Sequence, residues 1–236
     1  MGGEQEQDQY ALITGFEPRT KAIPPGSLFL ATFSASNFLI QQSSVPLTIM
    51  SFFMPKGIKP IYPLPHVSNT PEIPVEYVPV LNIVPALHQT TITNDVAAPR
   101  SYKYFFHVGV GNRDGVKVET IAHRTGYYKP DNQNFIPPGG NVVGYEDHQN
   151  LYQTKIDVEA LVKHFKTKTS KDGIALSRDA GRYLCEFIYY VSMAEGYKTD
   201  DKVVLFVHVP PEGEPYSIEE SREIIQEIIT WVVTHY

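Results

Sequence analysis

The sequence predicts an α/β protein in which helices cover both faces of a mixed, mainly parallel sheet. Short runs of β-branched and aromatic residues alternate along the chain with stretches that carry apolar residues at helical spacing, and this alternation is typical of such sheets. The chain has 236 residues, of which 42% are hydrophobic and 19% charged. These values indicate a single domain with a substantial core.

The predicted strands are short apolar runs bounded by glycine, proline or polar residues. The run Tyr104–Val110 is continuous and β-prone, which is typical of a strand buried on both faces. The other predicted strands are Tyr10–Thr14, Ile73–Tyr77, Val116–Glu119, Ile174–Leu176 and Lys202–Val209.

The predicted helices begin at capping residues and carry one apolar face. Asp157 and Asp179 each precede such a face, and Ser217 with Glu220 forms a capping-box signature. These three signals each predict the start of a helix. A fourth, shorter helix is predicted at Val80–His88.

Two irregular segments are also predicted. Residues 55–80 are rich in proline, which lacks an N–H donor and has a restricted φ, so they are expected to form an extended connector. Residues 129–147 form a long polar loop rich in proline and glycine. A loop of that length inside a compact domain is usually either functional or disordered.

The stretch Ala22–Pro55 carries no charged side chain. A membrane span is disfavoured because Asn37, Gln41 and Pro46 interrupt any stretch of about 20 apolar residues. A buried helix or strand, or a poorly packed segment, is the expected alternative.

Charge and cysteine usage limit the function classes. The net charge of −6 argues against a nucleic-acid-binding protein, which needs a basic face. The one cysteine, Cys185, cannot form an intramolecular disulfide and suggests a reducing, cytoplasmic location. Residues 1–8 are polar and acidic, unlike a signal peptide. We expect them to form a disordered tail before a domain at 9–236, with no membrane partner.

Three residues with complementary chemistry lie near the predicted ends of strands or the start of a helix. They are Glu119, Cys185 and His208, and sites in open α/β sheets form beyond the carboxyl ends of strands. A thiol, an imidazole and a carboxylate are the parts of a nucleophilic triad. From composition alone, however, an inert core cysteine and a structural histidine are the commoner outcome.

The amino-acid sequences of several segments resemble motifs of one family. Asp179–Phe187, with the sequence DAGRYLCEF, closely resembles the nucleophile segment of type I pyroglutamyl peptidases, a family of cysteine peptidases. Phe206–Pro211 resembles the histidine segment of that family, and Thr14–Pro18 resembles its opening signature. Ile73–Tyr77 and Phe106–Val110 are also similar. The resemblance covers roughly residues 9–19 and 73–236.

The resemblance implies the removal of N-terminal pyroglutamate from peptides, without a metal or other cofactor. It implies Cys185 as the nucleophile, His208 as base and acid, and Glu119 as the carboxylate that orients the imidazole. It also implies a single α/β/α domain around a twisted mixed sheet. The oligomeric state does not follow from it.

Substrate-binding residues follow from the same resemblance. Pyroglutamate is a small uncharged lactam, so its site should be apolar with a few polar backbone groups. Phe16 matches an aromatic pocket position of the family. Lys129 is the candidate for a basic residue downstream of the glutamate, with Arg124 as the alternative, although a solvated surface charge is the commoner outcome for both.

The sequence also departs from the family pattern. Arg19 stands where the family has a second phenylalanine, Thr120 replaces a usual basic residue, and an atypical segment at about 19–55 replaces the expected helix. The alternative function is therefore a catalytically impaired homologue that binds peptides or a partner. A third interpretation is an unrelated thiol enzyme.

Overall fold

The computed structural model describes residues 75–89, 102–168, 173–211 and 215–236, together with the backbone of short strands outside these ranges. The predicted tail at 1–8 lies outside the described residues, as does most of the segment at 19–55. Three strands of that segment are described: β2 (Ser27–Phe29), β3 (Thr32–Phe33) and β4 (Ile49–Met50).

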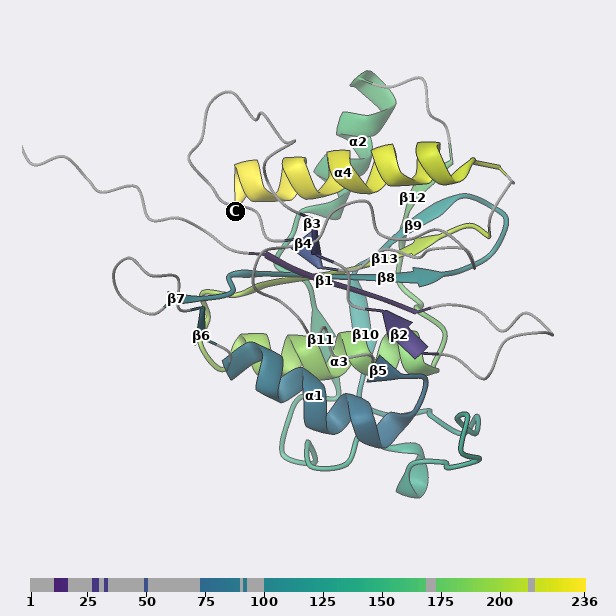
Figure 1. Ribbon diagram of the computed structural model, residues 1–236, viewed down its shortest axis with the longest axis vertical. Helices are drawn as coiled ribbons and strands as arrows, with labels where there is room; N and C mark the ends of the chain where they lie inside the picture. The colour runs from purple at the N-terminus through teal and green to yellow at the C-terminus, as the bar shows by residue number, and fades with distance from the viewer. Residues whose placement is uncertain are drawn as a thin grey trace, which may run out of the picture.

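The described strands include a seven-stranded mixed sheet in the order β12–β9–β13–β8–β1–β2–β5 (Figure 1). Its central strands β1, β8 and β13 are parallel to one another. β12 is parallel to β9, whereas β9 is antiparallel to β13 and β2 is antiparallel to β1. Besides β2, its strands are β1 (Ala11–Phe16), β5 (Ile73–Pro74), β8 (Tyr104–Val110), β9 (Val116–Glu119), β12 (Ile174–Ser177) and β13 (Val203–Val209). The predicted mixed, mainly parallel sheet is confirmed.

Three small two-stranded pairings lie beside the main sheet. β10 (Ile121–His123) pairs with β11 (Leu151–Gln153), β3 pairs with β4, and β6 (Thr91–Ile92) pairs with β7 (Arg100–Ser101). The sequence did not predict β10 and β11, because two or three residues are too few to show a strand period.

Helices cover the sheet on both sides (Figure 1). α1 (Tyr77–Gln89) and α3 (Leu184–Tyr197) lie on one face, and α2 (Val158–Lys168) and α4 (Ile218–His235) lie on the other. Each face has its own apolar core. β8 contributes Tyr104 and Phe106 to the core under α2 and α4, and Phe105 to the core under α1 and α3. This alternation explains why β8 is apolar at nearly every position.

α1 corrects two predictions. The helix begins at Tyr77, so the predicted strand Ile73–Tyr77 is limited to Ile73–Pro74 and the extended connector ends before 77. Pro79 lies in the first helical turn, where the backbone N–H has no intrahelical partner to lose. Pro85 lies inside the helix, as the sequence predicted, whereas Pro79 concealed the true helix start.

The start of α3 also differs from the prediction. Tyr183, not Asp179, is the N-cap residue, and its side chain makes no capping hydrogen bond. Gly181 and Arg182 have φ values of 95° and 45°, so the chain turns through the left-handed region before the helix begins. Asp179 accepts a hydrogen bond from the Gly181 N–H inside that turn (3.1 Å).

The other two caps are confirmed. Asp157 Oδ1 accepts a hydrogen bond from the Ala160 N–H at the start of α2 (2.9 Å). The Ser217 side chain accepts from the Glu220 N–H (3.2 Å), and Glu220 Oε2 accepts from the Ser217 N–H (2.9 Å). Together these bonds form the predicted capping box of α4.

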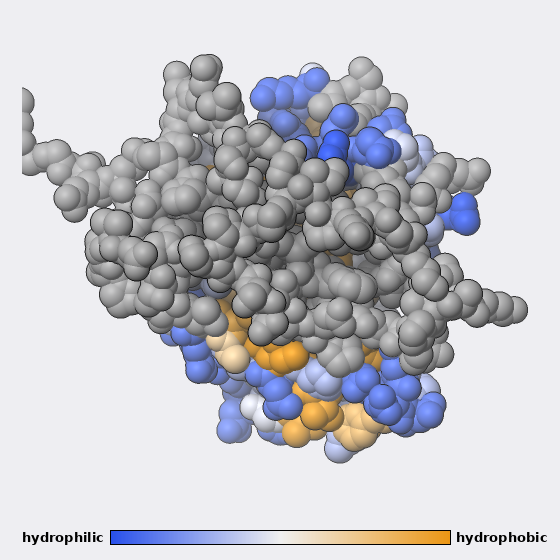
Figure 2. All heavy atoms as spheres, viewed as in Figure 1, coloured by the Kyte–Doolittle hydropathy of each residue, from blue (hydrophilic) through white to orange (hydrophobic). Residues whose placement is uncertain are grey.

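None of the helices in the described part of the chain has the length and apolar composition of a membrane span. The visible surface mixes polar residues with apolar ones that show around α1 (Figure 2). Val78, at the start of α1, is one exposed apolar residue, and Tyr128, just before the long loop at 129–147, is another.

Candidate active site

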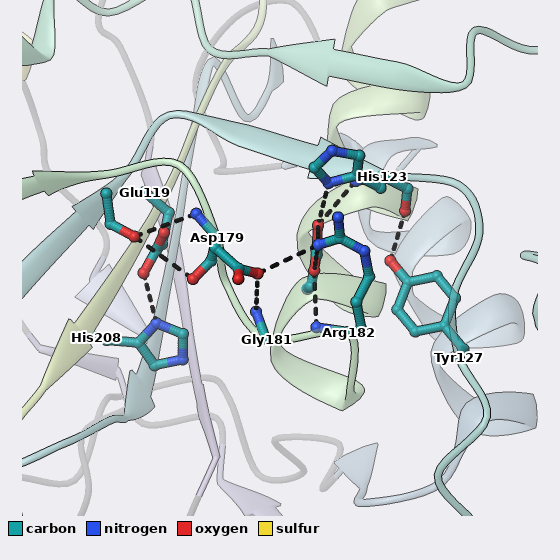
Figure 3. Close-up of polar contacts among 9 residues, drawn as sticks. Glu119, His123, Tyr127, Asp179, Gly181, Arg182 and His208 are labelled. Carbon is teal, nitrogen blue, oxygen red and sulfur yellow. Dashed lines mark hydrogen bonds and ion pairs between the residues drawn. The ribbon is translucent and has the colours of Figure 1, made fainter.

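Glu119 and His208 form a hydrogen-bonded pair, buried at Glu119 and partly exposed at His208, at the centre of the site (Figure 3). Glu119 ends β9 and is 1% exposed, and its Oε1 lies 2.8 Å from His208 Nδ1. In the register of β9 with β13, Glu119 lies opposite Phe206, and His208 lies opposite Lys117. The carboxylate therefore reaches the imidazole diagonally, across one face of the sheet.

The surroundings of His208 favour its protonated form. Burial lowers the pKa of His208, but hydrogen bonds with Cys185 and Glu119 outweigh it and raise the pKa from 6.5 to about 9. Nδ1 is used by Glu119, which leaves Nε2 for the thiol. At neutral pH the ring is therefore a proton donor beside the sulfur.

Two glycines of β8 and the loop after it make room for these side chains. A Cβ at Gly109 would lie 3.0 Å from Cys185 Sγ and 2.8 Å from Phe206 Cζ. A Cβ at Gly111 would lie 2.9 Å from His208 Cβ. Neither glycine is among the site residues expected from the sequence, although the Gly-Val-Gly pattern at the end of a buried strand is a signal of close approach.

Cys185 is the second residue of α3, at an end of the helix with free backbone donors. Cys185 is partly exposed to solvent. The first N–H groups of a helix have no carbonyl four residues earlier to bind, and none is capped here by the Tyr183 side chain. Such groups stabilise negative charge on a sulfur or on an oxyanion.

The structure describes the two expected substrate-binding residues to different extents: the backbone of Phe16, and the whole of Lys129. The backbone of Phe16, at the end of β1, pairs in register with Gly109, which in turn pairs with His208 on the other side. The Phe16 side chain and Arg19 lie outside the described residues. Lys129 is exposed, with its ammonium 4.2 Å from the centre of the Tyr183 ring.

Arg124, the alternative to Lys129, is engaged elsewhere. Its guanidinium donates to Asn150 Oδ1 at the surface, with Nε 3.1 Å from that oxygen.

An open groove of about 550 Å³ lies beside the site rather than in it. Thr120, Leu151 and Lys155 are among its lining residues, and neither Cys185 nor His208 is. Within the described residues, no group of three or more His, Cys, Asp or Glu side chains could hold a metal ion.

Comparison with known proteins gives one consistent family. The family model of pyroglutamyl peptidase PgaPase_1 matches residues 86–213, a range that contains Glu119, Cys185 and His208. Pyroglutamyl-peptidase 1 of Mus musculus is 36% identical over 159 residues, which cover 67% of this chain and 69% of the mouse protein.

Solved structures show the same fold. The pyrrolidone carboxyl peptidase from Thermococcus litoralis aligns with a TM-score of 0.62 at 16% identity, over 94% of this chain and 92% of that chain. The pyrrolidone carboxyl peptidase from Fervidobacterium islandicum AW-1 aligns with a TM-score of 0.61 at 19% identity, over 95% of this chain and 99% of that chain.

Proposed function

The chain belongs to the pyroglutamyl peptidase family, and we propose that it is a cysteine peptidase that removes N-terminal pyroglutamate from peptides. The observation that carries the proposal is the Glu119–His208 pair (2.8 Å) together with Cys185 at the uncapped start of α3, where the sulfur packs against Gly109, the residue that pairs with His208 in the sheet. This arrangement has the parts that nucleophilic catalysis by a thiolate requires.

In the first step, the Cys185 thiolate attacks the carbonyl carbon of the pyroglutamyl residue. The oxyanion of the tetrahedral intermediate is stabilised by backbone N–H groups at the start of α3. His208 then gives its Nε2 proton to the leaving amine as the C–N bond breaks. The products are a pyroglutamyl thioester on Cys185 and a peptide with a free N-terminus.

In the second step, water attacks the thioester carbonyl while His208 takes a proton from it. The C–S bond breaks, pyroglutamate leaves, and the Cys185 thiolate is restored beside protonated His208. Glu119 keeps Nδ1 protonated and stabilises the positive charge of the ring in both steps.

We assign Phe16 and Lys129 to substrate binding. The register of β1 and β8 supports Phe16, because its backbone lies beside Gly109, next to which the Cys185 sulfur packs. Lys129 is supported by its position over the ring of Tyr183, two residues before Cys185. A reducing, cytoplasmic location is proposed because the reaction needs a free thiol.

The test is the hydrolysis of a pyroglutamyl-coumarin amide by the purified protein. Turnover by the wild type and a loss of about 10³-fold or more in Cys185→Ala would support the proposal. Activity that survives in Cys185→Ala would exclude this mechanism. The alternative of an impaired, binding-only homologue is not favoured, and measurable turnover would end it.

A further inference from the structure

We propose that Glu186 is a positioning residue, which Arg182 and His123 hold in place so that it fixes Cys185 against His208. This inference rests on the proposed function, because it concerns the same nucleophile. The carboxylate oxygens of Glu186 bind Arg182 and His123, so Glu186 would act on Cys185 only through the backbone that carries both residues.

The Glu186 carboxylate is fully buried and is bound by donors from two other residues. Arg182 Nη1 donates to Oε1 and Oε2 at 2.8 and 2.7 Å, and the Arg182 backbone N–H donates to Oε2 at 2.8 Å. The His123 backbone N–H donates to Oε1 at 3.0 Å, and His123 Nδ1 lies 2.7 Å from the same oxygen. Both carboxylate oxygens are therefore fixed in direction.

These contacts stabilise the turn at Arg182, which sets the direction in which α3 begins. Arg182 has a φ of 45°, a left-handed conformation that is unfavourable for a residue with a side chain. Glu186 binds both the backbone N–H and the guanidinium of this one residue, so it stabilises that conformation directly. Cys185 lies between the two, and the direction of its side chain depends on this turn.

The same carboxylate connects the turn to the segment that carries the catalytic glutamate. His123 ends β10 and lies four residues after Glu119 in the chain. The Tyr127 hydroxyl donates to the His123 carbonyl oxygen (2.5 Å), which fixes His123 from the other side. Figure 3 shows His123, Arg182 and Tyr127 together, with the Glu119–His208 pair beyond the turn.

A positioning role fits the energetics better than a purely stabilising one. The Glu186 side chain is fully buried, whereas the Arg182 side chain is 35% exposed. Burying the carboxylate costs desolvation energy that can offset its attraction to the guanidinium, so apolar residues could stabilise the position as well. In addition, charge-assisted hydrogen bonds fix the orientation of the groups that they join. A misplacement of about 1 Å at a reacting atom can lower a rate by about 100-fold.

The experiment compares Glu186→Gln with a matched control, Glu195→Gln. Glu195 is a second buried glutamate of α3, bound by Tyr145 and Lys198 (both 2.6 Å) at the other end of the helix. For each folded variant, kcat and KM are measured with the pyroglutamyl-coumarin amide. The rate of Cys185 alkylation by iodoacetamide and the melting temperature are measured as well.

We expect Glu186→Gln to lower kcat by about tenfold to 100-fold and to slow alkylation, with KM changed less than about twofold. We expect Glu195→Gln to lower only the melting temperature. Unchanged kcat and alkylation in Glu186→Gln would overturn the inference, as would equal losses of kcat in the two variants.

The test also covers a Glu186→Gln variant that does not fold and a wild type that shows no turnover. If Glu186→Gln does not fold, His123→Ala takes its place, because His123 is partly exposed and the variant keeps the backbone N–H bond; unchanged kcat and alkylation there would also overturn the inference. A wild type without turnover would refute the proposed function alone, since the alkylation rates still test the position of Cys185.

Discussion

At the scale of single residues, the chemistry of the site depends on the partners of His208. Glu119 is almost inaccessible to solvent, and its charge is matched by an imidazole whose pKa is raised to about 9. The pair therefore acts as a unit, and the protonation of His208 is linked to the folding of the chain.

This linkage predicts a pH-dependent stability. The folded-state pKa of His208 lies above the unfolded value of 6.5, so the stabilisation is complete below about pH 6.5 and is lost as the pH rises through about 9. Glu119→Gln removes one cause of the raised pKa. We expect the difference in unfolding free energy between wild type and Glu119→Gln to shrink over this range.

The measurement is urea unfolding at about pH 6, 7.5 and 9.5. Glu227→Gln is the control, because Glu227 pairs with His164 in a more exposed position, 2.7 Å apart, where such a pair contributes little. A wild-type to Glu119→Gln difference that stays constant with pH would contradict the prediction.

A second prediction concerns the space that Gly109 leaves. In Gly109→Ala the new methyl group would meet Cys185 Sγ and the Phe206 ring at 3.0 and 2.8 Å. We expect a loss of about 1–3 kcal/mol in stability from overpacking, and a fall in kcat of about tenfold or more because the sulfur must move.

The measurements are urea unfolding and turnover of the pyroglutamyl-coumarin amide. Gly196→Ala serves as the control, since its Cβ would meet a Val204 methyl at 3.1 Å near the far end of α3. It should lower stability and leave kcat unchanged. Full activity in Gly109→Ala would show that the sulfur does not need this space.

At the scale of elements, the long loop at 129–147 is fastened to the start of α1. Asp131 is buried, and its carboxylate accepts N–H bonds from Tyr77 (3.0 Å), Gln133 (2.9 Å) and Phe135 (3.0 Å). The Tyr77 hydroxyl also donates to the Lys129 carbonyl oxygen (2.9 Å). The loop therefore follows a definite path beside the residues that precede Cys185.

Removal of this carboxylate should loosen the loop. In Asp131→Ala three backbone N–H groups lose their acceptor, and we expect the unfolding free energy to fall by about 1–3 kcal/mol. Limited proteolysis should then cut between 128 and 136 faster than in the wild type. Asp147→Ala, an exposed change in the same loop, is the control, and equal cleavage of the two variants would refute the prediction.

At the scale of the whole molecule, the mixed sheet brings distant parts of the chain together. Phe16, Gly109 and His208 lie in register on three parallel strands, while Glu119 arrives on a strand of opposite direction. Cys185 lies on α3, which packs against the same face of the sheet as α1. The site therefore depends on strand order as much as on any one segment.

Much of this architecture could be predicted from local patterns. The strand β8 and the helices α2 and α4 follow from an apolar run or a capping residue, and those signals act over a few residues. The short strands β10 and β11 and the true starts of α1 and α3 could not be predicted. The strands β10 and β11 have three residues each, which is too few to show a strand period. The start of α3 depends on the left-handed turn at Arg182, which is stabilised by the Glu186 carboxylate four residues later.

By itself, the sequence determined the α/β class, the family resemblance, and Glu119, Cys185 and His208 as the residues to consider, because composition and motif wording are properties of the chain. Only the tertiary structure decided that Glu119 reaches His208 diagonally, that Gly109 admits the sulfur, and that Glu186 fixes the turn before Cys185. Those contacts join residues from separate elements, so they exist only once the sheet order and the packing of α3 are set.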